Sequence, residues 1–361
     1  MPRKILVAGS HGVTGRAVVE HFAAEPDVSV VGASRRTGLG IPGVKEVSVD
    51  LTNVTSIRQG LADVSGVTHV VFGAYTEKAT AAERSAVNVG ILRNLLDVVE
   101  ETSPELRHIT FYQGGKAYGA DLGPFKTPAR EDDPRLMPPN FYYDQEDLLR
   151  ERQKGRAWSF TGLRPEGVGG FAVGNPMNLL TVIAVYATIS RELGIPLRFP
   201  GTEAAYRALY QMTSANLLAR ATDWAGTTTA ASNEIFNITN GDVFRWQHMW
   251  PRIAKMFGMD WADPIPTPLA TYMADKGELW RSIAANHSLQ PIPYETLVDW
   301  RFGDFIFNSG FDNITSTIKA RKAGFQDCID SEDMFAAEFA EMRAIGAIPK
   351  LTAASDISAL R

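Results

Sequence analysis

Short apolar segments alternate with amphipathic stretches through the first 165 residues of the chain. The apolar segments have the length of buried strands, and the stretches between them carry apolar residues at helical spacing. The predicted strands are Lys4–Gly9, Val28–Ala33, Glu46–Asp50, His69–Phe72, His108–Gln113 and Trp158–Leu163, and the predicted helices are Thr14–Ala24, Ser56–Asp63, Ala81–Glu101 and Asn140–Gln153. This alternation is typical of an α/β fold in which helices cover both faces of a doubly wound parallel sheet.

The pattern changes after Pro165, where helices outnumber strands. Further helices are predicted at Met177–Leu193, Ser214–Trp224, Arg245–Phe257, Leu269–Lys276 and Glu332–Ile345, with one strand at Glu234–Thr239. The segment Lys116–Pro139 is rich in glycine, proline and charge, which predicts a long loop across the top of the sheet. We therefore expect a cofactor-binding domain over 1–170 and a smaller, mostly helical substrate lobe over 171–350. The strand at 234–239 would return to the first domain, and 351–361 would form a loose tail.

Composition narrows the class of protein without naming it. The chain has 361 residues, of which 45% are hydrophobic and 21% charged, as in ordinary globular proteins. A net charge of −5 argues against nucleic acid or an anionic membrane as a partner. The single cysteine, Cys328, allows no internal disulfide and no metal-thiolate site, so no metal is expected.

The apolar run Ile5–Gly9 is too short for a signal peptide, and the apolar stretch near Leu179–Ile189 is too short to span a bilayer. We expect a cytoplasmic enzyme with a small-molecule substrate and no membrane partner. The oligomeric state stays open, and a homodimer would be common for such folds.

Three glycines, Gly9, Gly12 and Gly15, follow the first predicted strand and open the first predicted helix. Glycines at this place let backbone N–H groups approach a pyrophosphate, and the helix N-terminus adds partial positive charge. The spacing G-x-x-G-x-x-G differs from the usual G-x-G-x-x-G, so a plain strand-to-helix turn is the alternative. The position between strand and helix favours a Rossmann-type dinucleotide-binding domain.

The second predicted strand ends in Ser34-Arg35-Arg36. An NAD-binding fold usually carries an acidic residue there for the adenine ribose hydroxyl, whereas guanidinium groups attract a 2′-phosphate. The sequence therefore favours NADPH/NADP⁺ over NADH, with a solvated basic turn as the alternative. Asp50 and Leu51, at the end of the third predicted strand, would border the adenine.

Short-chain dehydrogenases pair a tyrosine with a nearby lysine, usually as Tyr-x-x-x-Lys on one helix, because the ammonium lowers the pKa of the phenol. Tyr112 and Lys116 have this spacing, but Tyr112 ends a strand and two glycines follow it, so no helix would bring the two together. We interpret this match as a coincidence. Tyr142 lies at the start of a predicted helix, yet Glu146 stands where the lysine is expected.

The segment Asn140-Phe-Tyr-Tyr-Asp-Gln-Glu-Asp147 resembles the hallmark of the progesterone 5β-reductase/iridoid synthase-like (PRISE) enzymes, an atypical branch of the extended short-chain dehydrogenases. In that family the lysine comes from an earlier Gly-x-Lys loop, which Gly114-Gly115-Lys116 matches. The resemblance extends to about Lys350 and includes Thr68-His69-Val70, Gly123-Pro124-Phe125, Arg164-Pro165, Met177-Asn178-Leu179 and Asn233–Trp246. It implies Lys116 and Tyr142 as the catalytic pair.

The resemblance and the motifs together give a set of expected site residues. Val168, Asn175 and Met177 would lie along the nicotinamide. The expected cofactor-binding residues are Gly9, Gly12, Val13, Thr14, Gly15, Ser34, Arg35, Arg36, Asp50, Leu51, Ala74, Gln113, Tyr142, Pro165, Val168, Asn175 and Met177. The expected substrate-pocket residues are Tyr75, Phe125 and Phe307.

Two departures from plant members bear on the substrate. Ala74-Tyr75 stands where those members tend to carry Thr-Trp, and Lys116-Ala-Tyr118 stands for their Lys-His-Tyr. Both would leave the cofactor chemistry intact but set the family's steroid and monoterpene dialdehyde substrates apart from those of this chain. An aromatic cluster of Phe302, Phe305, Phe307 and Phe311 would wall an apolar pocket, with core packing expected for at least half of its members.

The resemblance implies reduction of a carbon–carbon double bond conjugated to a carbonyl, with Tyr142 donating to the enolate oxygen and Lys116 assisting. Two alternatives remain. The same residues would serve 1,2-reduction of an aldehyde or ketone, and the chain would be a redox sensor if it bound NADPH without turnover. A sensor needs neither Lys116 nor Tyr142, so the presence of both favours an enzyme.

Overall fold

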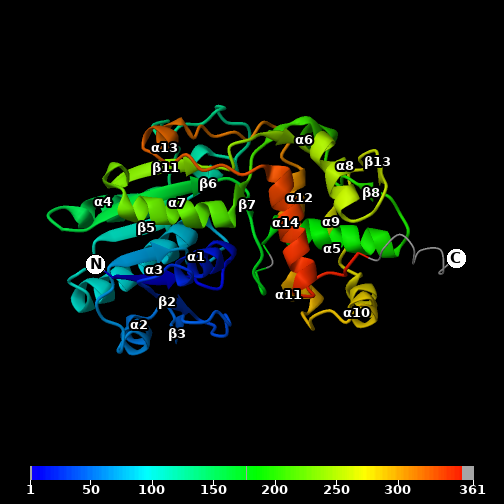
Figure 1. The fold of residues 1–361 in the computed structure, drawn as a ribbon. Coiled ribbons are helices and arrows are strands. Elements are labelled where there is room, and N and C mark those ends of the chain that lie inside the picture. The colour runs from blue at the N-terminus through cyan, green and yellow to red at the C-terminus, as the bar shows by residue number, and fades with distance from the viewer. Residues whose placement is uncertain (1, 176, 352–361) are drawn as a thin grey trace. The chain divides into compact units, whose positions relative to one another are not determined.

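The chain forms two compact units in the computed structural model, which describes residues 2–175 and 177–351 (Figure 1). Unit 1 comprises Met1–Val168, Thr213–Gly241 and Thr315–Cys328, and unit 2 comprises Gly169–Met212, Asp242–Ile314 and Ile329–Arg361. The chain therefore leaves unit 1 and returns to it twice. The predicted tail 351–361 lies, apart from Leu351, outside the described residues.

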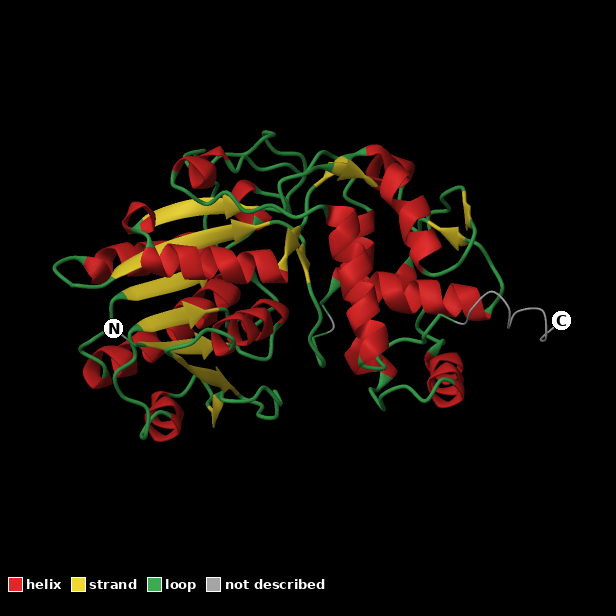
Figure 2. Ribbon diagram, in the orientation of Figure 1, coloured by secondary structure: helices red, strands yellow, loops and turns green. Residues whose placement is uncertain are grey.

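Unit 1 is built on a seven-stranded sheet in the order β11-β6-β5-β4-β1-β2-β3. All neighbouring strands are parallel, so every carboxyl end lies at the same edge. The strands are β1 (Arg3–Ala8), β2 (Val28–Ser34), β3 (Lys45–Ser48), β4 (His69–Phe72), β5 (His108–Tyr112), β6 (Ser159–Pro165) and β11 (Glu234–Ile238). Figure 2 shows these strands as one twisted layer between helices.

Helices cover both faces of this sheet. On one face α1 (Val13–Ala23) packs against α7 (Ala215–Thr227), and on the other α3 (Ala81–Thr102) packs between α2 (Val54–Gly60) and α4 (Phe141–Gln153). The unit is completed by the short helices η1 (Gly115–Tyr118), η2 (Thr229–Ala231) and α13 (Ile318–Lys322). The predicted doubly wound α/β fold is confirmed.

The core of unit 1 explains why the strands read as continuous apolar runs. Ile5, Leu6, Val7 and Ala8 of β1 are fully buried, because the central strand is covered on both faces. Asparagine side chains begin two of the helices: Asn53 accepts N–H bonds from the first turn of α2, and Asn140 does so for α4.

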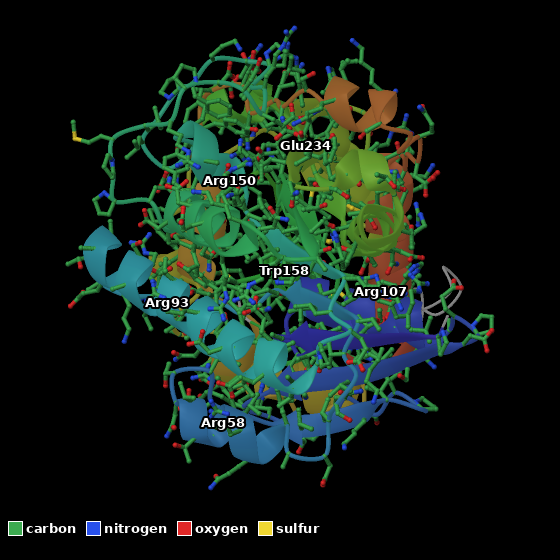
Figure 3. The ribbon with its side chains drawn as sticks, turned by 90° about the vertical axis from the view of Figure 1, so that its left-hand side faces the viewer. Arg58, Arg93, Arg107, Arg150, Trp158 and Glu234 are labelled. Carbon is green, nitrogen blue, oxygen red and sulfur yellow. The ribbon has the colours of Figure 1, made fainter. Side chains whose placement is uncertain are left out.

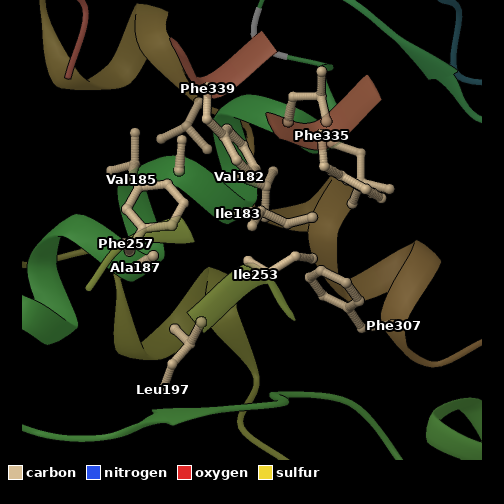
Figure 4. Close-up of a cluster of buried hydrophobic side chains, with 14 of the residues drawn as sticks. Val182, Ile183, Val185, Ala187, Leu197, Ile253, Phe257, Phe307, Phe335 and Phe339 are labelled. Atoms are coloured by element: carbon tan, nitrogen blue, oxygen red, sulfur yellow. The ribbon is translucent and has the colours of Figure 1, made fainter. Parts of the chain in front are cut away.

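Unit 2 is mostly helical and has its own apolar core. Figure 4 shows part of it, where α5 (Leu179–Glu192), α8 (Trp246–Met256), α12 (Trp300–Phe307) and α14 (Ser331–Ala344) bury large side chains against one another. The other helices are α6 (Glu203–Arg207), α9 (Leu269–Tyr272), α10 (Gly277–Asn286) and α11 (Tyr294–Leu297). Its short strands are β8 (Leu197–Arg198), β9 (Leu209–Tyr210), β12 (Phe244–Arg245) and β13 (Trp261–Ala262). The strand β7 (Val168–Gly169) begins with the last residue of the first segment of unit 1, and β10 (Thr213–Ser214) belongs to unit 1. Over the described ranges, no helix is both long enough and apolar enough to cross a membrane.

Candidate active site

The glycine segment forms a tight turn between β1 and α1. Gly9 has φ +86°, a left-handed conformation that favours glycine, and a Cβ there would lie 2.8 Å from the backbone nitrogen of Ala74. A Cβ at Gly15 would collide with the carbonyl oxygen of Gly9. The turn therefore packs against the end of β4 and under the first turn of α1, at the carboxyl edge of the sheet.

The first turn of α1 is free of side-chain capping. Gly12 is the N-cap residue and supplies no side-chain hydrogen bond, and Val13 and Thr14 are the first two helical residues. The N–H groups of a first helical turn carry partial positive charge and bind phosphate oxygens. The glycine cradle and the open helix end therefore fit a dinucleotide pyrophosphate.

The end of β2 carries the basic segment predicted for a 2′-phosphate. Arg35 and Arg36 are exposed, and the backbone N–H of Arg36 donates to the Ser34 hydroxyl at 3.3 Å. Asp50 is exposed at the next strand end, where hydrogen bonds from Thr52 hold the pKa of its carboxyl below the usual range. Leu51 beside it is buried, and its carbonyl accepts a bond from Asn94.

Sequence analysis missed two residues beside this basic segment. Glu46 on β3 accepts the backbone N–H groups of Gly38 and Leu39, at 2.7 and 3.0 Å, and so holds the loop that follows Arg36. Its carboxylate lies 3.8 Å from Nε2 of His11, in the glycine turn. Burial and then the charge of Arg36 lower the pKa of His11. The strand β3, the loop after Arg36 and the glycine turn come together only in the folded chain, so no local sequence pattern could have identified Glu46 and His11.

Lys116 and Tyr142 lie on segments that Asn140 joins directly. The Asn140 side chain accepts the backbone N–H of Tyr142 through Oδ1 and donates to the carbonyl of Lys116 through Nδ2, both at 3.0 Å. The hydroxyl of Tyr143 donates to the carbonyl of Ala117 at 2.7 Å and reinforces the junction. The η1 turn that carries Lys116 is thereby fixed to the first turn of α4, which carries Tyr142.

The Tyr142 hydroxyl lies against the glycines of the lysine loop. A Cβ on Gly114 would lie 3.3 Å from this hydroxyl oxygen, so a side chain there would crowd the Tyr142 hydroxyl. Burial, followed by the charges of Glu166 and Asp121, raises the pKa of Tyr142, while Arg164 and Arg84 act in the opposite direction. The phenol is therefore protonated at neutral pH. Glu166, which sequence analysis did not single out, is buried beside the loop, since a Cβ on Gly115 would lie 2.8 Å from its Oε2.

Tyr75 lies beside the same helix start. Its ring centroid is 5.4 Å from that of Phe141, and its hydroxyl donates to Glu77. Glu77 forms an ion pair with Arg84 at 3.0 Å. Burial raises the pKa of Glu77, but the Tyr75 bond and the charges of Arg84 and Lys116 outweigh it and lower the pKa. Lys116 thus acts on Glu77, a carboxylate that sequence analysis missed.

The side chain of Tyr112 lies apart from the residues around Lys116 and Tyr142. Its hydroxyl forms a hydrogen bond of 2.7 Å with Thr222 on α7, on the opposite face of the sheet from α4. Burial raises the pKa of this phenol. The structure therefore gives the Tyr112 side chain a packing role and supports our interpretation of the Tyr112–Lys116 spacing as a coincidence.

Gln113 and Phe125 contact protein groups rather than open space. The Gln113 side chain donates to the carbonyl of Tyr142 at 2.8 Å and accepts from Arg164 at 2.5 Å. Phe125 stacks on Tyr118 with ring centroids 6.4 Å apart. Pro165 is buried at the end of β6. The structure thus adds to Gln113 a bridging role that its predicted cofactor contact did not include.

The chain is similar in sequence to a known family along most of its length. The family of the PRISE-like Rossmann-fold domain matches residues 39–349. A "Short chain dehydrogenase gsfE" of Penicillium aethiopicum is 33% identical over 97% of this chain and 100% of its own length. The "(S)-8-oxocitronellyl enol synthase ISY2" of Nepeta racemosa is 32% identical over 95% of this chain and 91% of its own. The chain belongs to the PRISE-like family.

Solved structures agree on the fold of this PRISE-like protein. A UDP-glucose 4-epimerase superposes with a TM-score of 0.68 over 97% of this chain and 100% of its own, at 14% identity. The Bordetella bronchiseptica enzyme WbmG, solved in complex with NAD, superposes with a TM-score of 0.67 over 98% of each chain, also at 14% identity. The protein is thus an oxidoreductase of the short-chain dehydrogenase/reductase type with a Rossmann domain.

The remaining predicted residues of the PRISE-like protein are Val168, the last residue of the first segment of unit 1, and three residues of unit 2. Val168 is half-buried in β7, and in unit 2 the Asn175 N–H donates to the Ala172 carbonyl at 3.3 Å. Met177 is exposed. Phe307 is buried in the core of unit 2, where it packs on Phe199, Trp246 and Trp250, so its observed role is core packing rather than that of an exposed pocket wall. Among the described residues, no group of three or more His, Cys, Asp or Glu side chains is placed to hold a metal ion.

Proposed function

We propose that this protein is an NADPH-dependent reductase of carbon–carbon double bonds conjugated to a carbonyl, with Tyr142 as the donor to the carbonyl oxygen and Lys116 assisting it. The observation that carries the proposal is the Asn140 bridge, which fixes the Lys116 loop to the helix turn of Tyr142. The bridge brings together two residues that are far apart in the chain. The family membership of the chain and the name of the Nepeta relative, an enol synthase, agree with a reaction that passes through an enolate.

NADPH is the cofactor that the binding residues fit best. The glycine turn and the open end of α1 suit the pyrophosphate, and Ser34, Arg35 and Arg36 place a hydroxyl and two guanidinium groups where a 2′-phosphate would bind. Bound there, the cofactor would supply a hydride. Asp50 and Leu51 would border the adenine, and Val168, Asn175 and Met177 would lie along the nicotinamide.

The state of Tyr142 suits a hydrogen-bond donor. Its pKa is raised by burial, so at neutral pH the hydroxyl keeps its proton and donates to an oxygen that becomes negatively charged as the double bond is reduced. A donor that is already in place when the charge develops needs no reorganisation, and this lowers the barrier. Lys116 would add positive charge on the same side. Tyr75 and Phe125 would contact the substrate.

The role of Tyr142 can be tested by removing one tyrosine hydroxyl at a time with Tyr→Phe variants. Tyr142→Phe is expected to lower kcat on 2-cyclohexenone with NADPH at least a hundredfold, since removing one donor to a developing oxyanion costs about 10²–10³ in rate. Tyr112→Phe is the matched control, because that hydroxyl is also buried but bonds to Thr222. It should keep kcat within about threefold.

Product analysis by NMR separates the two modes of reduction. A saturated ketone means 1,4-addition as proposed, and an allylic alcohol means 1,2-reduction. Wild-type turnover by Tyr142→Phe would contradict the role of Tyr142. Tight NADPH binding without consumption across a panel of activated alkenes would instead favour a redox sensor.

A further inference from the structure

A buried arginine, Arg164, is hydrogen-bonded to residues of both segments that carry the proposed catalytic pair. Arg164 is the penultimate residue of β6, and its side chain is only 6% exposed. Its Nε donates to Oε1 of Gln113 at 2.5 Å, and its Nη1 donates to the hydroxyl of Tyr118 at 3.0 Å. Its Nη2 lies 3.4 Å from a carboxylate oxygen of Glu146. A buried guanidinium is costly unless its donors are satisfied, and here each nitrogen has a partner.

Glu146 is the anchor of this arginine. It lies one helical turn after Tyr142, at the position where other short-chain dehydrogenases carry their lysine, and its side chain is 7% exposed. Arg150, which Figure 3 labels on α4, and Arg135 also pair with it, at 2.9 and 3.2 Å. Burial raises the pKa of Glu146, but the hydrogen bond and charge of Arg150 and the charges of Arg164 and Arg135 outweigh it and lower the pKa. Glu146 is therefore ionised at neutral pH.

Arg164 is linked to Tyr142 by hydrogen bonds through one residue, Gln113. Gln113 accepts from Arg164 through Oε1 and donates through Nε2 to the carbonyl of Tyr142 at 2.8 Å. The Gln113 side-chain amide therefore has one orientation, because only with Oε1 toward Arg164 and Nε2 toward the Tyr142 carbonyl are both hydrogen bonds formed. The Arg164 charge also acts on the Tyr142 hydroxyl, against the charges of Glu166 and Asp121.

Arg164 reaches the lysine segment as well. Tyr118, which accepts from Nη1, is the last residue of η1, and Lys116 lies two residues earlier in the same turn. The Tyr118 hydroxyl donates onward to Asn237 at 2.6 Å, so its position is fixed from both sides. One guanidinium on β6 thus connects the turn of Lys116 with the helix of Tyr142.

We propose that Arg164, anchored by Glu146, is a positioning residue that holds the backbone of Tyr142 through Gln113 and the Lys116 turn through Tyr118. The inference rests on the proposed function in one respect, because it takes Tyr142 as the donor. It assigns a purpose to the replacement of lysine by glutamate at position 146. The glutamate binds the arginine that orients the tyrosine.

The experiment compares two arginines that each pair with buried or partly buried carboxylates. Arg164→Met removes the proposed positioning residue. Arg152→Met is the matched control, since Arg152 lies on α4 and pairs with Asp97 at 2.6 Å and Glu100 at 2.9 Å but has no hydrogen bond to the catalytic segments. We expect Arg164→Met to lower kcat at least tenfold while the KM and fluorescence-measured Kd for NADPH stay within threefold. Arg152→Met should lower the thermal midpoint yet keep kcat within twofold, and equal losses of kcat in both variants would overturn the proposal.

A conservative variant keeps the test decisive if Arg164→Met does not fold. Arg164→Lys retains the charge but cannot contact Gln113, Tyr118 and Glu146 at once. A kcat at least threefold below wild type, with unchanged NADPH affinity, supports the positioning role, and a wild-type kcat in this variant overturns it.

A double-variant cycle then identifies the residue through which Arg164 acts. If it acts through Tyr142, adding Arg164→Lys to Tyr142→Phe should not lower the single-turnover rate further, whereas an additive loss would contradict this route. The outcomes also separate the two proposals. Full activity in Tyr142→Phe removes the proposed function, and an inactive Tyr142→Phe beside a fully active Arg164→Lys removes only the positioning role.

Discussion

At the scale of single residues, the proposed preference for NADPH rests on the side chains at the end of β2. We predict that the double variant Arg35→Ser/Arg36→Ser weakens NADPH binding about ten- to a hundredfold, because hydrogen bonds to a charged group contribute about 1.5–3 kcal/mol. NADH affinity should stay within threefold, since that cofactor has no 2′-phosphate. Fluorescence titration with both cofactors measures this.

Arg58→Ser controls for the loss of surface charge, since Arg58 is exposed on α2 and pairs with Glu101 (Figure 3). Its replacement should leave both affinities unchanged. An equal weakening of NADPH and NADH in the double variant would show that Arg35 and Arg36 do not read the 2′-phosphate.

Residues that the sequence predicts for the site differ in a physical way from those that only the fold brings to it. Gly9, Gly15 and Arg35 belong to local patterns, in which the backbone turn and the end of a strand determine the residue type. Glu46 and Glu166 belong to no such pattern. Glu46 acts on a loop seven to eight residues earlier, and Glu166 acts on the hydroxyl of Tyr142, so their roles exist only once the strands are side by side.

At the scale of elements, Asn140 caps α4 and also bonds to the carbonyl of Lys116, so we expect its loss to affect both stability and activity. We predict that Asn140→Ala destabilises the protein by about 1 kcal/mol, as the loss of an N-cap does. It should also lower kcat at least tenfold, because the Lys116 turn is no longer tied to Tyr142. Chemical denaturation and steady-state kinetics measure the two effects separately.

Asn53→Ala is the matched control for that prediction. Asn53 caps α2 with the same geometry, accepting the N–H groups of Thr55 and Ser56. No hydrogen bond joins the Asn53 side chain to Lys116 or Tyr142, so Asn53→Ala should show the same loss of stability with an unchanged kcat. If both variants lost activity equally, capping alone would explain the effect and the bridge would have no catalytic role.

Helices and strands could be predicted where the pattern of apolar residues along the chain reflects which side chains are buried. The strands β1, β4 and β5 are apolar because helices cover both faces of the sheet, and their predicted bounds differ from the observed ones by at most one residue. The helices α10 and α12 were not predicted. In α12 the sequence Trp-Arg-Phe-Gly-Asp-Phe-Ile-Phe reads as an aromatic cluster, and the glycine inside it, Gly303, is required because a Cβ there would lie 2.7 Å from Val182.

At the scale of the whole molecule, family and fold were predictable because they rest on many separate short motifs. The arrangement inside the site was not. Lys116 and Tyr142 were paired by resemblance, but the bridge through Asn140 and the support through Arg164 and Gln113 depend on how β5, β6 and α4 meet. Segments such as Thr315–Cys328, which return to unit 1 late in the chain, carry no periodic pattern that indicates their destination.

The pH dependence of global stability should reflect a buried histidine pair at the amino ends of β4 and β5. The rings of His69 and His108 lie 6.4 Å apart, and burial, followed by the charge of His69, lowers the pKa of His108 to about 3. An unfolded chain has an imidazole pKa of about 6.5, so between pH 6.5 and about 3 it binds a proton that the folded chain does not. Stability therefore falls as the pH drops through this window, and the loss is complete near pH 3.

We predict that His108→Asn weakens this acid sensitivity, because it removes the buried imidazole while an amide can still bond to Ser159. The difference in unfolding free energy between pH 7 and pH 4 should be smaller than in wild type by about 3 kcal/mol. Urea denaturation at the two pH values measures it, and the same replacement at the exposed His287 controls for the loss of an imidazole. An unchanged difference in His108→Asn would mean that His108 binds its proton in the folded protein as readily as in the unfolded chain.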